Sequence, residues 1–119
     1  MGKSFSQRIL SGGMVMQKGE VWWANLPPPI GRRPVVLLSC DEAYAVRNAV
    51  TVAEVTTRIR EIPVEVPLGP EDGLSKKCVV NFDTLATIRK DLLVERISLL
   101  SSEKIERVNA AIKFALSLL

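Results

Sequence analysis

Histidine is absent from this chain, and its absence restricts the chemistry more than any other feature of the composition. Serine and cysteine nucleophiles are commonly activated by histidine, and many ribonucleases use histidines as general acid and base. Those mechanisms are excluded here. Any catalysis must rely on arginine, lysine, hydroxyl groups or carboxylates.

Cysteine is scarce as well, with only Cys40 and Cys78, and the two are not spaced as a CxxC pair. A zinc site needs three or four ligands, which this chain cannot complete without histidine. We therefore expect no metal and no other cofactor. Two buried free thiols, as in a cytoplasmic protein, are favoured over a disulfide.

Long apolar runs are also missing. No stretch approaches the roughly 20 apolar residues that span a bilayer, and the N-terminus lacks the continuous apolar segment of a secretory signal. This pattern predicts a cytoplasmic protein that does not associate with membranes. The net charge of +3, from 16 basic and 13 acidic residues, weakly favours a polyanionic partner.

The length of 119 residues, 47% of them hydrophobic, allows one buried core and hence one domain. Residues 1–15 are polar, contain Gly12 and Gly13 and show no periodicity. They are predicted to form a disordered N-terminal extension. The domain is expected to cover residues 16–119.

Short strands dominate the expected structure of that domain. Branched and aromatic residues recur in runs bounded by proline, glycine and polar residues, which is typical of strands. Prolines within residues 62–68 place that run at a sheet edge, and a helical turn is expected at residues 89–93. The expected strands are residues 19–25, 34–38, 49–55, 62–68, 78–82, 85–88 and 97–100. This spacing predicts a mainly β fold, a small barrel.

One long helix is expected at the C-terminus. Ser101 or Ser102 can cap its N-terminus, and Glu103 suits the positive end of the helix dipole. Ile105, Val108 and further apolar residues follow at helical spacing. The result is an amphipathic helix whose apolar face should close one mouth of the barrel.

The most informative segment is Gly31-Arg32-Arg33-Pro34, which directly precedes a buried strand. Cleavage of RNA by its own 2′-hydroxyl builds negative charge on the phosphoryl oxygens. An arginine held at the end of a strand can bind two of these oxygens, but its high pKa makes it a poor proton donor. Arg33 is therefore a candidate for stabilising this charge. Taken alone, two adjacent arginines such as Arg32 and Arg33 are more often ordinary solvated residues at the rim of a fold.

A second segment, residues 55–58, ends an apolar run with Thr56 and Thr57 followed by Arg58. A threonine at a strand end can donate a hydrogen bond to a phosphoryl oxygen without adding negative charge. Alone, paired threonines usually reflect only β propensity. They indicate a phosphate-binding site only in combination with the upstream arginines.

In this order and spacing the chain resembles the MazF/PemK toxin family. The resemblance is carried by the segments at residues 19–26, 31–37, 55–57 and 78–81, and it covers residues 18–118. It implies an SH3-like barrel that dimerises and cleaves single-stranded RNA at short motifs. It further implies neutralisation by an antitoxin of the MazE type with an acidic, partly disordered tail.

The resemblance also implies catalytic roles for Arg33 and Thr56. Products would carry a 2′,3′-cyclic phosphate or its opened 3′-phosphate and a 5′-hydroxyl, with no metal or nucleotide cofactor. Relatives often carry a longer loop with a carboxylate before the Arg-Pro pair, and this chain has only residues 27–32 there. The group that accepts the 2′-hydroxyl proton is therefore left open.

Substrate-binding residues are expected close to these motifs, because cations and amides suit phosphates and base edges. The candidates are Arg32, Thr57, Arg58, Asn81 and Lys77. The few aromatic residues that could stack on bases are Trp22, Trp23, Tyr44 and Phe82, with core packing favoured for both tryptophans.

Two other functional hypotheses stay open at this point. A protein-binding toxin of the same barrel type, like the gyrase-poisoning relatives, would act without cutting RNA, and its apolar helix end at residues 114–119 would serve as an anchor. A non-enzymatic nucleic-acid-binding barrel would keep the cations but make Thr56 dispensable.

Overall fold

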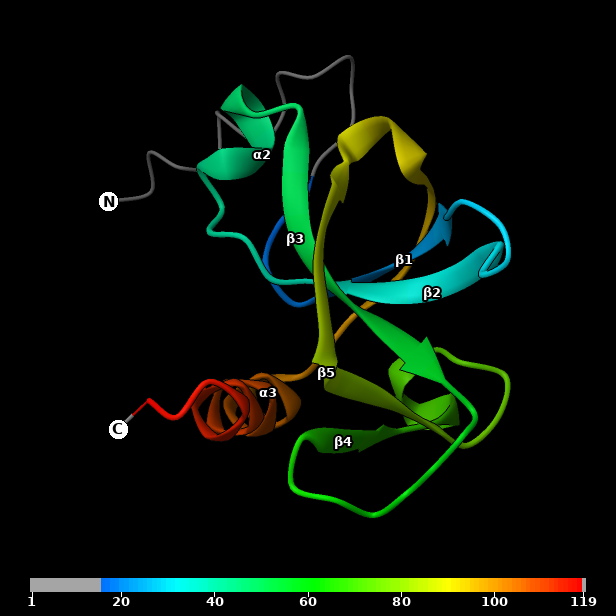
Figure 1. The fold of residues 1–119 in the computed structure, drawn as a ribbon, viewed down its shortest axis with the longest axis vertical. Helices are drawn as coiled ribbons and strands as arrows, with labels where there is room; N and C mark the ends of the chain where they lie inside the picture. Colours follow the sequence, from blue (N-terminus) through cyan, green and yellow to red (C-terminus); the bar gives the residue numbers. More distant parts are fainter. Residues whose placement is uncertain (1–15, 119) are drawn as a thin grey trace.

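The computed structural model describes residues 16–118, which form one strongly curled, six-stranded antiparallel sheet and a C-terminal helix (Figure 1). The strand order in the sheet is β4-β5-β3-β2-β1-β6. The strands are β1 (Glu20–Asn25), β2 (Arg32–Leu37), β3 (Ala49–Thr56), β4 (Glu65–Leu68), β5 (Cys78–Arg89) and β6 (Leu93–Leu99). The mainly β fold, a half-barrel with a terminal helix, confirms the predicted fold class. The extension predicted at residues 1–15 lies outside the described residues, and the domain boundary stays a prediction.

Several element boundaries differ from those expected. β4 is an edge strand as predicted, but it begins three residues later, because Glu65 N donates to Ile62 O (3.0 Å) and closes a turn. β6 begins at Leu93, earlier than expected. Three short elements also form: the helix α2 (Ala43–Val46), the 3-10 turn η1 (Pro70–Asp72) and the 3-10 turn η2 (Lys90–Leu92). The last of them lies close to the helical turn expected at residues 89–93.

The expected strands at residues 78–82 and 85–88 are one long strand, β5, with an irregularity in its middle. Its pairing with β3 shifts register between Ala53 and Val55. At the shift, Asn81 Oδ1 accepts from Asp83 N (2.8 Å), and Thr84 Oγ1 donates to Asn81 O (2.7 Å). These local bonds replace ladder bonds and bend the strand, as bulges do. β3 pairs with β5 on both sides of the bend, and residues 78–81 of β5 also pair with β4 along their other edge (Figure 1).

The curled sheet is apolar on both faces because successive residues of each strand point to opposite sides. Val21, Val36 and Phe82 belong to a core cluster on one face, and Trp22 and Val35 belong to a cluster on the other. Both faces of the central strands are therefore covered, which makes those strands a rigid support for residues at their ends.

The C-terminal helix α3 (Ser102–Ala115) confirms the predicted amphipathic helix. Ser101 is the N-cap, and its hydroxyl accepts from Lys104 N (3.1 Å). Val108 and Ala111 are buried, and the helix packs against β4 and β5. In the part of the chain that the structure describes, no helix is long and apolar enough to cross a membrane.

One expectation about a single side chain was wrong. Cys40 is exposed, so only Cys78 is the buried free thiol that was expected. Burial, helped by nearby Asp72, raises the pKa of the Cys78 thiol and keeps it protonated. Tyr44 and Phe82 lie in the core, as does Trp22. Of the four candidate stacking residues, only Trp23 is partly exposed.

Candidate active site

The site forms where β2 and β3 separate. Their ladder ends at the pair Val35↔Glu54, and the next residue of β2, Pro34, has no amide hydrogen to extend it. Side chains two residues apart on a strand share a face. Arg33 therefore lies on the same face as Val35, and Thr56 on the same face as Glu54. The two predicted catalytic residues are thus brought to one side of the sheet, at neighbouring strand ends.

A cavity of about 150 Å³ opens at this place, and we call it the charged cavity. β2, β3 and β5 each contribute to its wall, together with the loop after β3. Its lining residues are Arg33, Glu54, Thr56, Arg58, Arg60, Asn81 and Thr84. Three guanidinium groups face one carboxylate, so the cavity has a positive balance that suits a phosphodiester.

Glu54 is the direct partner of Arg33. Arg33 Nη1 lies 3.2 Å from Glu54 Oε1, with 36% of the arginine side chain and 19% of the glutamate side chain exposed. The pair orients the guanidinium, yet leaves part of it open to the cavity. It also places a carboxylate, which can accept a proton, beside the predicted charge-stabilising group.

Thr56 is oriented by the backbone that follows it. Its Oγ1 accepts a hydrogen bond from Arg58 N (3.1 Å). Because this amide occupies a lone pair of the hydroxyl oxygen, the hydroxyl can act as a donor toward the cavity. A donor held in this way can stabilise charge that develops on a phosphoryl oxygen.

A buried carboxylate shapes the loop that carries Arg58 and Arg60. Glu65 is 8% exposed, and its Oε1 accepts from Arg60 N (3.0 Å) and Glu61 N (3.0 Å). Glu61 has a φ of 59°, a backbone conformation that L residues rarely adopt. The Glu65 carboxylate therefore holds this loop in an otherwise unfavourable shape and sets the positions of both arginines.

We expect Glu65→Ala to lower both stability and activity. Two partly buried amides lose their acceptor, which should cost about 1 kcal/mol of unfolding free energy. The arginines of the released loop should lose their alignment, lowering kcat/KM for RNA cleavage about 10-fold or more. Denaturant unfolding and steady-state kinetics measure the two effects. Glu106→Ala, an exposed glutamate of α3, is the matched control, and equal behaviour of the two variants would contradict this role.

Asn81 lines the same cavity but is largely committed to the bend in β5. Its side-chain oxygen accepts from Asp83 N, and the residue is 7% exposed. The carboxamide NH2 is the group that can still donate to a phosphate or a base. Asn81 therefore combines a structural role with a position at the cavity wall.

The other predicted substrate-binding residues lie elsewhere. Arg32 points to the opposite face, where its Nη2 is 3.3 Å from Glu95 Oε1 and its guanidinium lies 4.7 Å from the centroid of the Trp23 ring. Thr57 lines a neighbouring, more apolar pocket. Lys77 is exposed and lines neither cavity, whereas Lys76 lines the apolar pocket. The functional roles of all these residues stay predictions.

Sequence reasoning missed Glu54, Arg60 and Thr84, which also line the charged cavity. For Glu54 a local signal existed, because it stands two residues before Thr56 in the same strand and so shares its face. Arg60 and Thr84 had no such signal. They reach the cavity only through the loop held by Glu65 and the bend in β5.

No group of three or more histidine, cysteine, aspartate or glutamate side chains is placed to hold a metal ion among residues 16–118. The polar groups of the charged cavity are mostly donors, which suit an anion. What the arrangement can do chemically is therefore to bind a phosphodiester, neutralise added negative charge and accept a proton at Glu54.

The protein is a small half-barrel, a curled antiparallel sheet with a terminal helix. Arginine and threonine side chains at its strand ends line one cavity, whose charge suits a phosphodiester. The family model for PemK-like, MazF-like toxins of type II toxin-antitoxin systems matches residues 17–116. The chain belongs to this family.

Individual relatives agree with that assignment. The chain is 36% identical over 99 residues to a protein named probable endoribonuclease MazF5 of Mycobacterium tuberculosis, covering 82% of this chain and 90% of the relative. It is 33% identical over 112 residues to the endoribonuclease MazF of Staphylococcus saprophyticus, covering 87% and 93% of the two chains.

Solved structures show the same fold. The toxin MazF-mt6 of Mycobacterium tuberculosis aligns with a TM-score of 0.78 and 30% identity, over 83% of this chain and 97% of that one. A mycobacterial endoribonuclease in complex with its cognate antitoxin also aligns with a TM-score of 0.78, at 27% identity, over 88% and 98% of the chains.

Proposed function

We propose that this protein is the toxin of a toxin-antitoxin pair and acts as a metal-independent endoribonuclease that cuts single-stranded RNA at a short sequence motif. One observation carries the proposal: Arg33 and Thr56 face the same charged cavity, where Glu54 stands next to Arg33. Relatives at 33–36% identity are named endoribonucleases, which supports the same activity.

The reaction would begin with the 2′-hydroxyl of the RNA beside the scissile phosphate. Glu54 accepts the proton of this hydroxyl as the oxygen attacks phosphorus, which answers the question left open by the short loop at residues 27–32. Binding of the phosphate displaces the Arg33 guanidinium from the Glu54 carboxylate toward the phosphoryl oxygens. This exchange frees the carboxylate at the moment when a base is needed.

Negative charge then develops on the two non-bridging oxygens of the phosphate. The Arg33 guanidinium can bind both oxygens, and the Thr56 hydroxyl donates to one of them. Arg58 and Arg60 add positive charge at the wall of the same cavity. In this scheme these side chains stabilise the developing charge without an imidazole or a metal ion.

The bond between phosphorus and the 5′-oxygen finally breaks. The 5′-oxygen leaves and takes a proton from solvent water, giving a 5′-hydroxyl end. The other product carries a 2′,3′-cyclic phosphate, which water can open to a 3′-phosphate. Every proton that leaves the 2′-hydroxyl or reaches the 5′-oxygen is thereby accounted for.

The proposal includes an antitoxin and a second copy of the chain. A mycobacterial relative was solved with its cognate antitoxin, and a positively charged cavity suits an acidic, partly disordered antitoxin of the MazE type that would cover it. We further propose a homodimer acting in the cytoplasm, on the family relationship.

The experiment that tests the function is a cleavage assay with purified protein. We expect fragments from single-stranded RNA in the presence of EDTA, with 5′-hydroxyl and cyclic-phosphate ends identified by end labelling and mass spectrometry. An RNA with a single 2′-deoxynucleotide at the cut should resist cleavage, because the attacking hydroxyl is missing. Intact RNA under all conditions, or cutting of the deoxy substrate, would exclude the proposed reaction.

The same assay separates the alternatives. A protein-binding toxin would use the apolar helix end, where Phe114 is 60% exposed, and would leave RNA intact. A non-enzymatic RNA-binding barrel would retain RNA on a filter without cutting it. Neither alternative needs Arg33 and Glu54 paired beside Thr56, so the arrangement of the charged cavity favours the nuclease.

A further inference from the structure

An ion pair and several hydrogen bonds join the first turn of α3 to the segment that precedes β5. Lys104 Nζ lies 2.8 Å from Asp72 Oδ2 and 2.9 Å from Pro67 O. Only 14% of the lysine side chain and 4% of the aspartate side chain are exposed. Charged side chains are rarely buried to this extent unless they are paired. These contacts therefore hold η1 firmly against the start of the helix.

Lys104 stands at a position where the helix itself disfavours a cation. It is the third residue after the N-cap Ser101, at the positive end of the helix dipole. In a capping box, a glutamate or glutamine at this position accepts a hydrogen bond from the N-cap amide. Local helix preferences therefore do not account for the lysine, whereas its contact with Asp72 does. A residue that breaks a local rule in this way is a candidate for a functional role.

Asp72 is fixed from two further sides. Its Oδ2 also accepts from Gly69 N (3.0 Å), and its backbone oxygen accepts from Ser98 Oγ of β6. The next residue, Gly73, has a φ of 90°, and a Cβ there would lie 2.9 Å from Ser98 Cβ. Glycine thus lets the chain leave η1 in close contact with β6. Asp72 is the point at which α3, η1 and β6 meet.

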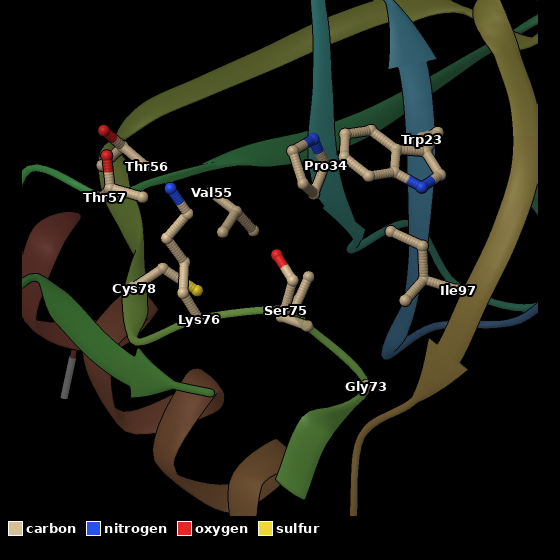
Figure 2. Close-up of a pocket in the computed structure, with 11 residues that line it drawn as sticks. Trp23, Pro34, Val55, Thr56, Thr57, Gly73, Ser75, Lys76, Cys78 and Ile97 are labelled. Atoms are coloured by element: carbon tan, nitrogen blue, oxygen red, sulfur yellow. The ribbon is translucent and has the colours of Figure 1, made fainter. Parts of the chain in front are cut away.

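The segment that starts at Gly73 forms one wall of the neighbouring apolar pocket, whose volume is about 270 Å³. Figure 2 shows this segment running from Gly73, next to Ile97 of β6, to Cys78. Thr56 lines both this pocket and the charged cavity. The place of residues 73–76 relative to Thr56 therefore sets the width of the space beside the predicted catalytic residues.

The same segment has few anchors of its own. Leu74 N donates to Gly69 O (3.3 Å), whereas Ser75 and Lys76 are exposed and make no hydrogen bond within residues 16–118. Its course is thus set by Asp72 at one end and by the start of β5 at the other. Because β5 is fixed by the sheet, Asp72 is the end at which the position of the segment is controlled.

We propose that Lys104 is a positioning residue for RNA cleavage, which acts through Asp72 to hold residues 73–76 in the place that productive RNA binding needs. This inference rests on the proposed function. Lys104 lines neither the charged cavity nor the apolar pocket, so it acts only through the segment. A wall that is fixed in advance does not have to be ordered when RNA binds, which strengthens binding.

The first test compares Lys104→Met and Lys104→Arg in the whole protein. Methionine keeps most of the length of lysine but loses the charge, so the segment is released, whereas arginine keeps a charged donor near Asp72. We expect Lys104→Met to raise KM for RNA roughly 10-fold, because binding must then order the segment. The single-turnover rate at saturating RNA should stay close to that of the wild type. Lys104→Arg should recover most of the wild-type KM.

A double-mutant cycle shows whether Lys104 acts through Asp72. Asp72→Asn removes the charge of the partner, and the double variant leaves no buried charge unpaired, so it stays folded even if Lys104→Met does not. In the Asp72→Asn background, Lys104→Met should change KM little further, because interacting residues are not additive. Independent, additive effects on KM would overturn the proposal.

Two variants of the same helix serve as controls. Lys113→Met removes an exposed lysine from the last turn of α3 and changes the net charge equally, and its KM should stay near that of the wild type. Val108→Ala removes buried apolar volume and lowers stability without touching Asp72. If Val108→Ala raises KM as much as Lys104→Met does, at a temperature where both are folded, lost stability explains the effect and the proposal is overturned.

Hydrogen exchange supplies a readout that does not depend on cleavage. The amides of Gly69, Asp72 and Leu74 are hydrogen-bonded around η1. We expect them to exchange roughly 10-fold faster in Lys104→Met, with unchanged exchange in β2 and β3. If the wild-type protein cuts RNA but Lys104→Met keeps the wild-type KM and exchange, the positioning role alone fails. If the wild-type protein cuts no RNA, the proposed function has failed and this role fails with it.

Discussion

Arg33→Ala is expected to abolish detectable RNA cleavage, lowering the rate constant roughly 10²- to 10³-fold, as loss of one donor to a developing oxyanion does. Arg33 is the only predicted catalytic cation, and its position between Glu54 and the cavity is set by β2. Single-turnover cleavage of a labelled RNA measures the rate. Arg33→Lys should recover only part of it, because an ammonium keeps the charge but lacks the planar fork.

The control for this prediction is Arg89→Ala. Arg89 is also an exposed, ion-paired arginine, but it lies at the opposite end of the β3–β5 ladder from Thr56. We expect this variant to cut RNA at the wild-type rate. Thermal unfolding should show both variants folded. Full cleavage by folded Arg33→Ala protein would rule out the mechanism.

The second large effect is expected from Glu54→Gln. If Glu54 accepts the 2′-hydroxyl proton, the amide variant loses the base and cleavage should slow about 10²- to 10⁴-fold. The amide oxygen can still accept the hydrogen bond from Arg33, so the guanidinium stays in place. If Glu54 merely positioned Arg33, the Glu54→Gln enzyme would therefore retain most of the wild-type activity. Glu95→Gln, which changes the exposed partner of Arg32, is the matched control.

Local sequence patterns were sufficient to predict most of the secondary structure of this protein and the family to which it belongs. The alternation of apolar residues identified most strands, and Ser101 marked the start of the terminal helix, because both patterns depend on neighbours within a few residues. The motif with Arg33 and Thr56 led to the family. The absence of histidine from the chain by itself restricted the chemistry.

The tertiary structure decided which further side chains line the charged cavity together with Arg33 and Thr56. Arg60 reaches the charged cavity because Glu65 holds its loop, and the bend at Asn81 brings Thr84 to the same wall. Lys76, and not Lys77, lines the neighbouring apolar pocket. Strand periodicity follows from bonds within a segment, whereas loop paths and bends depend on contacts between distant segments, which no local pattern records.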